Sequence, residues 1–312
     1  MVGLVTLFGG GGFLGRYVAQ ELFRRGVRVR FAERDPRKAW FLKPLGGLGQ
    51  SQFVSADITK PASVARALES ADAAINLVGI LKGDFEAFHV EGARNVAEAA
   101  SAAGLQTLVH ISALGADPAS LSAYGRSKAE GEAAILSAFP KATILRPSIV
   151  FGPEDQFVNR FARMIRMLPA VPVIRPGVKF QPVFVNDVAH ASADAVVQPD
   201  LHGGKAYEIA GPEVLTMAAL IAEVARMIGR EPNLVEVPDV VARAMARFGG
   251  WAPGAPITWD QWLMLQTDNV ASAGSKGLAA FGISPTPLTA VAPEWLVQYR
   301  RHGRFGAVNK AA

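Results

Sequence analysis

The segment LVTLFGGGGFLGRYVAQELF, residues 4–23, decides how the rest of the chain is interpreted. Its first five residues predict a buried strand, and the apolar spacing after the glycines predicts a helix. Gly9, Gly12 and Gly15 form the pattern G-x-x-G-x-x-G between the two. Glycine allows a tight turn there and lets a pyrophosphate reach the backbone N–H groups, while the helix start adds its positive dipole end. The segment therefore predicts a phosphate-binding loop after the first strand.

Strand-like and helix-like segments alternate through the next 130 residues. The expected strands span residues 27–33, 51–57, 73–79, 107–113 and 142–152, and the expected helices span 14–26, 63–70, 88–104 and 127–139. This alternation predicts an α/β fold, a Rossmann-type doubly wound parallel sheet with a small interleaved C-terminal part. We expect a dinucleotide-binding core at 1–150, completed by about 178–200, and a smaller lid or docking part at 151–177 and 201–312.

Composition excludes several classes of protein. The 312 residues are 50% apolar and 19% charged, which is typical of a folded globular protein. There is no cysteine, which excludes disulfides, thiolate metal sites and thiol nucleophiles, and the five histidines show no metal-ligand spacing. The net charge of +5 is spread along the chain, so we expect no nucleic-acid binding. A solvated basic face, or affinity for an anionic membrane or acidic partner, remains open.

The sequence offers no membrane-spanning or targeting segment. No apolar run approaches the ~18–20 residues that cross a bilayer. The start, MVGLVTLFGG, has neither a basic n-region nor an Arg- and Ser-rich presequence. We therefore expect a soluble protein that stays in the compartment where it is made.

The end of the second strand bears on the choice of nucleotide. A carboxylate there binds the ribose hydroxyls of NAD, and an arginine accommodates the 2′-phosphate of NADP. The sequence FAERDP offers both Glu33 and Arg34, and Asp35-Pro36 predicts a turn just beyond. Arg34, helped by Arg16, favours NADP(H) over NAD(H), although Arg34 could also be a surface arginine.

Two further strand ends point to the same ligand. Asp57 follows the third strand and could accept a hydrogen bond from the adenine amino group. Alternatively, Asp57 is a helix N-cap, a role that Thr59 could also fill. The sequence NLVG, residues 76–79, ends the fourth strand beside the expected path of the cofactor, and its alternative role is simple core packing.

Tyr124 and Lys128 lie four residues apart in a predicted helix, so they share one face. A lysine cation lowers the pKa of a nearby phenol, and the tyrosine can then exchange a proton with a carbonyl or hydroxyl while hydride moves at the nicotinamide. Ser112, at the end of the fifth strand, would complete the trio. The pair could equally serve only to hold the nicotinamide ribose of a nucleotide that never turns over.

These motifs together resemble a known family. The loop GGGGFLG, the sequences ADIT and NLVG, the Ser112, Tyr124 and Lys128 trio and LRPSIVFGPEDQF resemble the extended and atypical short-chain dehydrogenase/reductases. FPKATILRPSIVFGPEDQFVNRF (139–161) and FQPVFVNDVAHA (180–191) resemble more narrowly the family of NADPH-binding accessory subunits of respiratory complex I, the NADH:ubiquinone oxidoreductase, and its bacterial relatives.

The resemblance implies a set of functional residues. As catalytic residues it implies Tyr124, Lys128 and Ser112. As cofactor-binding residues it implies Gly9, Gly12, Phe13, Leu14, Gly15, Arg16, Arg34, Asp57, Ile58, Val78, Gly79, Tyr124, Lys128 and Pro147.

The resemblance also implies a setting. In that family the nucleotide is a structural element, and the C-terminal part lies against the membrane-associated complex. We therefore expect complex I subunits as partners, peripheral contact with membrane lipid or quinone, and a cytoplasmic location that includes the cytoplasmic face of the inner membrane.

The chain departs from the broader family at His89-Val90-Glu91-Gly92, where many members have N-x-x-G. His89 either replaces the asparagine in positioning the active site or is a satisfied histidine on a helix face. The helix predicted in FVNRFARMIRMLPAVPVI, residues 157–174, carries Arg160, Arg163 and Arg166 beside apolar residues. It is either packed on the sheet with a solvated basic rim or a surface for an apolar partner, lipid or quinone-like tail.

Three functions remain open from the sequence. The first is an NADP(H)-binding accessory or assembly protein of complex I with a tightly held structural nucleotide. The second is an active NAD(P)-dependent oxidoreductase on an apolar carbonyl or quinone-related substrate, using Tyr124 and Lys128. The third is a sugar-nucleotide epimerase or dehydratase, which the apolar character of residues 157–174 disfavours.

Overall fold

The computed structural model describes residues 2–250, 257–301 and 303. These residues form two compact units, between which the chain passes several times. Unit 1 contains residues 1–147, 185–209 and 272–284, and unit 2 contains residues 148–184, 210–271 and 285–312. The C-terminal part is thus interleaved with the core, as the sequence predicts.

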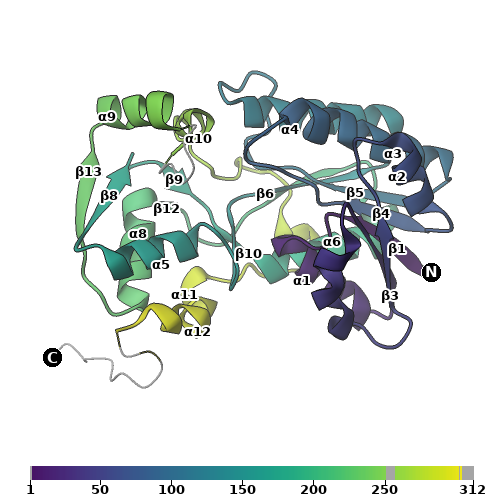
Figure 1. Cartoon of the computed structure of the whole chain (residues 1–312), viewed down its shortest axis with the longest axis horizontal. Coiled ribbons are helices and arrows are strands. Elements are labelled where there is room, and N and C mark those ends of the chain that lie inside the picture. The colour runs from purple at the N-terminus through teal and green to yellow at the C-terminus, as the bar shows by residue number, and fades with distance from the viewer. Residues whose placement is uncertain (1, 251–256, 302, 304–312) are drawn as a thin grey trace. The chain divides into compact units, whose positions relative to one another are not determined.

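Unit 1 is built on a seven-stranded sheet in which all neighbouring strands are parallel. Its order is β11-β6-β5-β4-β1-β2-β3, and Figure 1 labels β6, β5, β4, β1 and β3. The strands are β1 (Leu4–Phe8), β2 (Arg28–Glu33), β3 (Ser51–Ser55), β4 (Ala73–Asn76), β5 (Thr107–Ile111), β6 (Thr143–Pro147) and β11 (Ala206–Ile209). The chain reverses its direction of winding between β1 and β4, which is where doubly wound sheets bind ligands. This order confirms the predicted Rossmann-type fold.

Helices cover both faces of this sheet. One face carries α1 (Phe13–Arg24) and α6 (Val185–Val197), which pack against each other, and the other carries α2 (Pro61–Leu68), α3 (Gly92–Ala102) and α4 (Ala123–Ala138). The remaining helices of unit 1 are η1 (Pro36–Leu45), η2 (Glu86–Glu91), α7 (Pro199–His202) and η4 (Leu278–Phe281). The helix expected at 88–104 is therefore a π-helical turn, η2, followed by α3.

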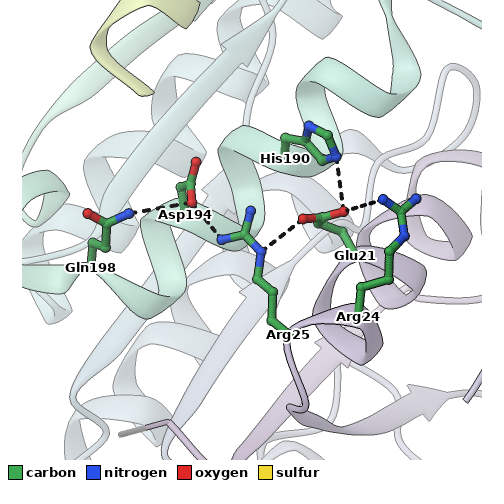
Figure 2. A network of polar contacts seen from close by, with 6 residues as sticks. All are labelled: Glu21, Arg24, Arg25, His190, Asp194 and Gln198. Carbon is green, nitrogen blue, oxygen red and sulfur yellow. Dashed lines mark hydrogen bonds and ion pairs between the residues drawn. The ribbon is translucent and has the colours of Figure 1, made fainter. Parts of the chain in front are cut away.

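The helices α1 and α6 are joined by a polar network that Figure 2 shows. Glu21 of α1 accepts from Arg25 at 2.9 Å and pairs with Arg24 at 3.1 Å and with His190 of α6 at 3.0 Å. Arg25 continues the network to Asp194 of α6 at 2.5 Å. Glu21 is buried, so these partners offset the cost of placing its charge between two helices.

The core of unit 1 follows from the sequence pattern. All five residues of β1 are buried, as expected for a parallel strand covered on both faces. The buried face of α3 consists of small residues at helical spacing, Ala93, Val96, Ala97 and Ala100, which pack with Leu108 of β5. Alanines bring α3 close to the sheet, which fixes the strand ends that carry the site.

One sequence prediction about this sheet is wrong. Residues 142–152 form two strands: β6 belongs to the seven-stranded sheet, whereas β7 (Val150–Phe151) pairs with β10 (Val183–Phe184) in unit 2. The interruption follows Pro147, which lacks a backbone N–H for further pairing. The limits of the core also differ from the expected ones, because β11 and residues 272–284 belong to unit 1 rather than to the C-terminal part.

Unit 2 combines small sheets with helices. Its remaining strands are β8 (Ala170–Ile174), β9 (Lys179–Phe180), β12 (Leu215–Thr216) and β13 (Asn233–Val237). Its helices are α5 (Val158–Met167), α8 (Met217–Met227), α9 (Asp239–Ala244), η3 (Met245–Gly249), α10 (Trp259–Met264), α11 (Leu288–Val291), α12 (Pro293–Leu296) and η5 (Val297–Tyr299). A core of side chains from α5, α8 and α11 holds this unit together.

The segment with Arg160, Arg163 and Arg166, whose role the sequence left open, forms α5. Phe157, Phe161, Met164 and Ile165 belong to the core of unit 2, and Met167 is exposed. The segment is therefore a packed helix, but it packs against α8 and β8 of unit 2, whereas the seven-stranded sheet belongs to unit 1. His302, Arg304 and Phe305, near the C-terminus, lie outside the described residues. Within the described part of the chain, no helix is both long and apolar enough to cross a membrane.

Candidate nucleotide-binding site

The glycine loop has the geometry that an anion site requires. Gly9 has φ of +78°, and a Cβ there would lie 3.2 Å from Cγ2 of Val78. A Cβ on Gly15 would lie 2.4 Å from the carbonyl oxygen of Gly10, so only glycine fits. Gly12 precedes the first turn of α1, which carries no acidic residue and includes Phe13, Leu14 and Arg16. Backbone N–H groups of the loop and the positive end of α1 thus meet at one place.

Glu33 and Arg34, the two candidates at the end of β2 for contact with the nucleotide ribose or its 2′-phosphate, lie in different surroundings. Glu33 accepts a hydrogen bond from the backbone N–H of Gly11 at 2.5 Å, and burial raises the pKa of its carboxyl group. Arg34 is exposed, and its guanidinium lies 5.6 Å from the ring centroid of Phe88. Arg16 lies in the same way over Phe41, at 5.0 Å. The carboxylate thus braces the glycine loop, while two arginines stack on aromatic rings near the strand end.

Asp57 forms a local turn after β3. Its Oδ1 accepts from the backbone N–H of Thr59 at 3.0 Å and from the Thr59 hydroxyl at 2.8 Å. Burial alone would raise the pKa of Asp57, but these bonds and the nearby Lys60 and Arg34 hold it below its usual value. The N-cap of α2 is Lys60, so neither Asp57 nor Thr59 caps that helix.

The other predicted cofactor residues contribute in different ways. Val78 packs on Gly9, and its N–H donates to Oδ1 of Asn76 at 3.1 Å; Gly79 next to it is exposed. The side chain of Ile58 belongs to the core, so only its backbone could face a ligand. The carbonyl of Pro147 accepts from the N–H of Leu114 at 2.8 Å and continues the β5–β6 pairing.

Lys128 is the most buried of the three predicted catalytic residues. It is 2% exposed, and its Nζ donates to the carbonyl of Ile111 at 2.8 Å. Burial lowers its pKa to about 8, which Glu132 partly opposes. Ser112 comes directly after Ile111 and is buried, so the lysine head group and the serine lie at one strand end. Tyr124 is one turn before Lys128 on α4, which Ser122 caps by accepting from the N–H of Gly125 at 3.2 Å.

His89 holds this arrangement together through a chain of hydrogen bonds. Its Nε2 accepts from the backbone N–H of Ile80 at 3.0 Å, and its Nδ1 lies 2.9 Å from Oγ of Ser127. Because Nε2 accepts, the neutral ring carries its proton on Nδ1 and donates to Ser127, whose hydroxyl donates to the carbonyl of Tyr124 at 2.9 Å. His89 therefore joins the loop after β4 to the first turn of α4.

Neighbouring aromatic rings also hold the His89 side chain in place. The His89 ring stacks on Phe85 at 5.3 Å and meets the ring of Tyr124 edge-on at 5.5 Å. Burial, with a contribution from Lys128, lowers the pKa of His89 to about 4, so it is neutral near pH 7. Sequence reasoning singled out His89 but missed Ser127 and Phe85, because nothing in their spacing shows contact across η2 and α4.

The residues of this site fit a dinucleotide. Glycine at positions 9 and 15 lets the loop take its tight path, because a Cβ would crowd Val78 at position 9 and overlap the backbone of Gly10 at position 15. Arg16 and Arg34, which lie over Phe41 and Phe88, could bind a nucleotide phosphate. A bound nicotinamide nucleotide would supply hydride, Lys128 could hold its ribose, and Tyr124 could exchange the proton. Over residues 2–250 and 257–301, no three acidic or histidine side chains are grouped as a metal would need.

Comparison with known proteins agrees with this class of nucleotide-binding fold. Residues 5–210 match the NAD dependent epimerase/dehydratase family, and the chain belongs to that family. It is 34% identical to the mouse (Mus musculus) mitochondrial protein named NADH dehydrogenase [ubiquinone] 1 alpha subcomplex subunit 9, with 96% of this chain and 81% of that protein aligned.

Two further similarities are with named reductases. The chain is 30% identical to a ceramide reductase of Caulobacter vibrioides, over 80% of this chain and 78% of that protein. Its fold matches an NADPH-dependent quinone oxidoreductase of Escherichia coli, solved with NADPH, with a TM-score of 0.77, 22% identity, and coverage of 94% and 99%. The resemblance read from the sequence is thereby confirmed.

Proposed function

We propose that this chain is an NADP(H)-binding accessory protein of respiratory complex I, in which a tightly held nucleotide stabilises the fold. The observation that carries the proposal is the extent of the similarity to the alpha subcomplex subunit 9. It runs over 307 residues, and so through both units and not only the nucleotide-binding one. The similarity to the ceramide reductase has a lower identity and covers less of this chain, 30% over 256 residues.

The experiment compares retention of the nucleotide with its exchange. Protein purified without added nucleotide is denatured, the released compound is identified, and exchange against excess labelled NADPH is followed in the native protein. Stoichiometric NADPH that exchanges only on unfolding supports the structural role. An empty or rapidly exchanging site refutes it.

NADPH is the proposed nucleotide because Glu33 is engaged by the Gly11 N–H, whereas Arg34 is exposed at the strand end. Arg34→Ala should weaken NADPH binding roughly tenfold or more and leave NADH binding within about twofold, since a charge-assisted bond to the 2′-phosphate is lost. Arg37→Ala is the matched control, because Arg37 is an exposed arginine paired with Asp35. Equal losses for both nucleotides would argue against 2′-phosphate recognition by Arg34.

The proposed location follows from the proposed partner. Association with complex I would place the chain at the cytoplasmic face of a bacterial inner membrane. Co-sedimentation with membranes that contain complex I, and its loss when complex I is absent, is the corresponding measurement.

A second candidate is an active reductase on an apolar carbonyl, favoured by the intact Ser112, Tyr124 and Lys128 and by the similarity to a ceramide reductase. In this function a bound NADPH would supply the hydride for the carbonyl carbon, and Tyr124 would donate the proton to the carbonyl oxygen. Tyr124→Phe should abolish NADPH-dependent reduction of an apolar carbonyl substrate and retain NADPH binding. Turnover that survives this change would remove Tyr124 from the mechanism.

A further inference from the structure

The π-helical turn η2 carries two neighbouring side chains that contact different parts of the nucleotide site. His89 bonds the Ile80 N–H and Ser127, close to the helix end that carries Tyr124. Phe88, the residue before it, lies under Arg34, with 5.6 Å between the guanidinium and the centroid of the ring. Turns of this π-helical kind are rare and frequently occur at functional sites. The contact with Arg34 points to a role for Phe88 at the end of β2.

The Phe88 ring is anchored in unit 1 rather than left on its surface. It is partly buried and packs against the core cluster that underlies α3, as do Val54 of β3 and Val78 after β4. A ring held by core packing keeps its position whether or not a ligand is present. Phe88 therefore offers Arg34 a fixed apolar face.

The backbone that carries Phe88 is enclosed as well. A Cβ on Gly131 of α4 would lie 2.2 Å from the carbonyl oxygen of His89, so α4 packs directly on the turn. Just beyond the turn, Asn95 of α3 donates a hydrogen bond to the carbonyl of Ile58 at 2.8 Å. The segment is thus held from α4 on one side and from the loop after β3 on the other.

Arg34 has the chemistry to bind a phosphate but depends on a neighbour for its position. It is exposed, and in the part of the chain that the structure describes its guanidinium forms no hydrogen bond or ion pair. Its N–H donors are therefore available to an anion. An unsupported arginine has many rotamers to lose on binding a ligand, whereas an arginine already stacked on a fixed ring has fewer.

We propose that Phe88 is a positioning residue that determines nucleotide specificity: its ring holds the Arg34 guanidinium where the 2′-phosphate of NADPH would be bound. The ring contacts one face of the cation and leaves the N–H edge free for phosphate oxygens. NADH has a hydroxyl at that position and gains little from the same arrangement. This inference rests on the proposed choice of NADPH, and Phe88 acts on that choice through Arg34.

The other pair of an arginine and a ring is built differently. Arg16 lies over Phe41 at 5.0 Å, but Phe41 belongs to η1 and is 49% exposed. A ring that is half in solvent restricts its arginine less than one packed against the core. The positioning role is therefore assigned to Phe88 rather than to Phe41.

The first experiment measures which nucleotide the folding chain selects. The full chain is denatured, freed of nucleotide and refolded in an equimolar excess of NADPH and NADH, and the bound nucleotides are identified. Phe88→Leu, which keeps an apolar side chain against the core, should lower the ratio of bound NADPH to bound NADH roughly threefold or more. Phe88→Tyr keeps the ring and should leave the ratio within about twofold of the parent.

Phe53→Leu is the matched control for loss of an aromatic side chain from unit 1. Phe53 of β3 stacks on Phe31 with ring centroids 4.9 Å apart, so its ring partner is another phenylalanine rather than an arginine. Any loss of stability in this variant affects the binding of both nucleotides alike. The ratio of bound NADPH to bound NADH should therefore stay within about twofold of the parent, which separates a change of specificity from a change of stability.

The second experiment repeats the measurement in the Arg34→Ala background. If Phe88 acts through Arg34, Phe88→Leu lowers the ratio in the parent chain and has no further effect once Arg34 is removed. An equal fall in both backgrounds, or equal losses of NADPH and NADH binding, would overturn the inference and assign Phe88 to packing or to direct contact with the shared part of the nucleotide.

The parent chain distinguishes this inference from the choice of nucleotide on which it rests. A parent that binds both nucleotides equally well would contradict the choice of NADPH, and the role of Phe88 with it. A parent that prefers NADPH, with the same ratio in Phe88→Leu, would overturn the role of Phe88 alone.

Discussion

Gly15 is the residue at which the nucleotide loop is least tolerant of change. A Cβ at this position would overlap the backbone of Gly10, so the loop must move to admit it. We expect Gly15→Ala to lower NADPH affinity by roughly tenfold or more, because displaced N–H groups no longer converge on the phosphates. Isothermal titration of protein stripped of nucleotide and refolded would measure this. Gly177→Ala is the control, since a Cβ there meets nothing within 4 Å. Unchanged affinity in Gly15→Ala would contradict the assigned loop geometry.

His89 gives the folded chain a defined dependence on pH. Its pKa is lowered to about 4 in the fold, from 6.5 in an unperturbed histidine. Between these values the unfolded chain binds more protons, so stability is complete above about pH 6.5 and is lost as the pH falls toward 4. Over the full interval between these two pKa values, the free energy of unfolding changes by roughly 3 kcal/mol. Burial of His110 also lowers its pKa and acts in the same direction.

Replacing His89 by a residue that does not titrate separates its contribution to the pH dependence of stability from that of His110. We expect His89→Asn to keep an acceptor for the Ile80 N–H and to show a smaller loss of stability between pH 7 and 4.5 than the parent chain. Urea unfolding at several pH values measures how the free energy of unfolding depends on pH in each of the two proteins. Parallel pH profiles for the two proteins would mean that His89 is not held neutral in the fold.

At the scale of elements, a polar network fixes the C-terminal end of α1, the helix that follows the glycine loop, against α6. Glu21 pairs with Arg24, Arg25 and His190, and Arg25 continues to Asp194, which follows it by 169 residues in sequence (Figure 2). A buried carboxylate with several partners contributes more than an exposed pair.

We expect Glu21→Gln to lower the free energy of unfolding by about 1–3 kcal/mol, because the arginines lose their charged partner while the side-chain volume is kept. Glu223→Gln removes the exposed pair with Arg226 on α8 and should cost less than about 1 kcal/mol. Chemical denaturation of both variants gives the comparison. Equal losses in the two variants would show that burial of the Glu21 network adds nothing to the free energy of unfolding.

At the scale of the whole molecule, a bound nucleotide should stabilise a unit that the chain assembles from three separate segments. A ligand that binds only the native state adds RT ln(1 + [L]/Kd), or roughly 3 kcal/mol at a hundredfold excess over Kd. We expect removal of the nucleotide to lower the unfolding temperature and addition of NADPH to restore it, with NADH less effective at equal concentration. Differential scanning fluorimetry measures this, and an unfolding temperature that NADPH does not change would contradict the proposed structural role.

The sequence by itself determined the order of the first five strands along the chain, the glycine loop after β1 and the positions of Tyr124, Lys128 and Ser112. These features depend on local signals: an apolar strand before G-x-x-G-x-x-G, glycine where a Cβ would clash, and an i, i+4 pair on one helix. Such local patterns can be recognised in one sequence because residues that are close along the chain remain close in the fold.

Only the tertiary structure decided which groups meet across elements. It showed that Glu33 braces the loop, that His89 and Ser127 join η2 to α4, that residues 142–152 divide between two sheets, and that α9 rather than α5 exposes its large apolar side chains. Each of these depends on contacts between segments far apart in sequence or on which face of a helix is covered. Periodicity gives the faces of a helix, but packing alone decides which of them is left to solvent.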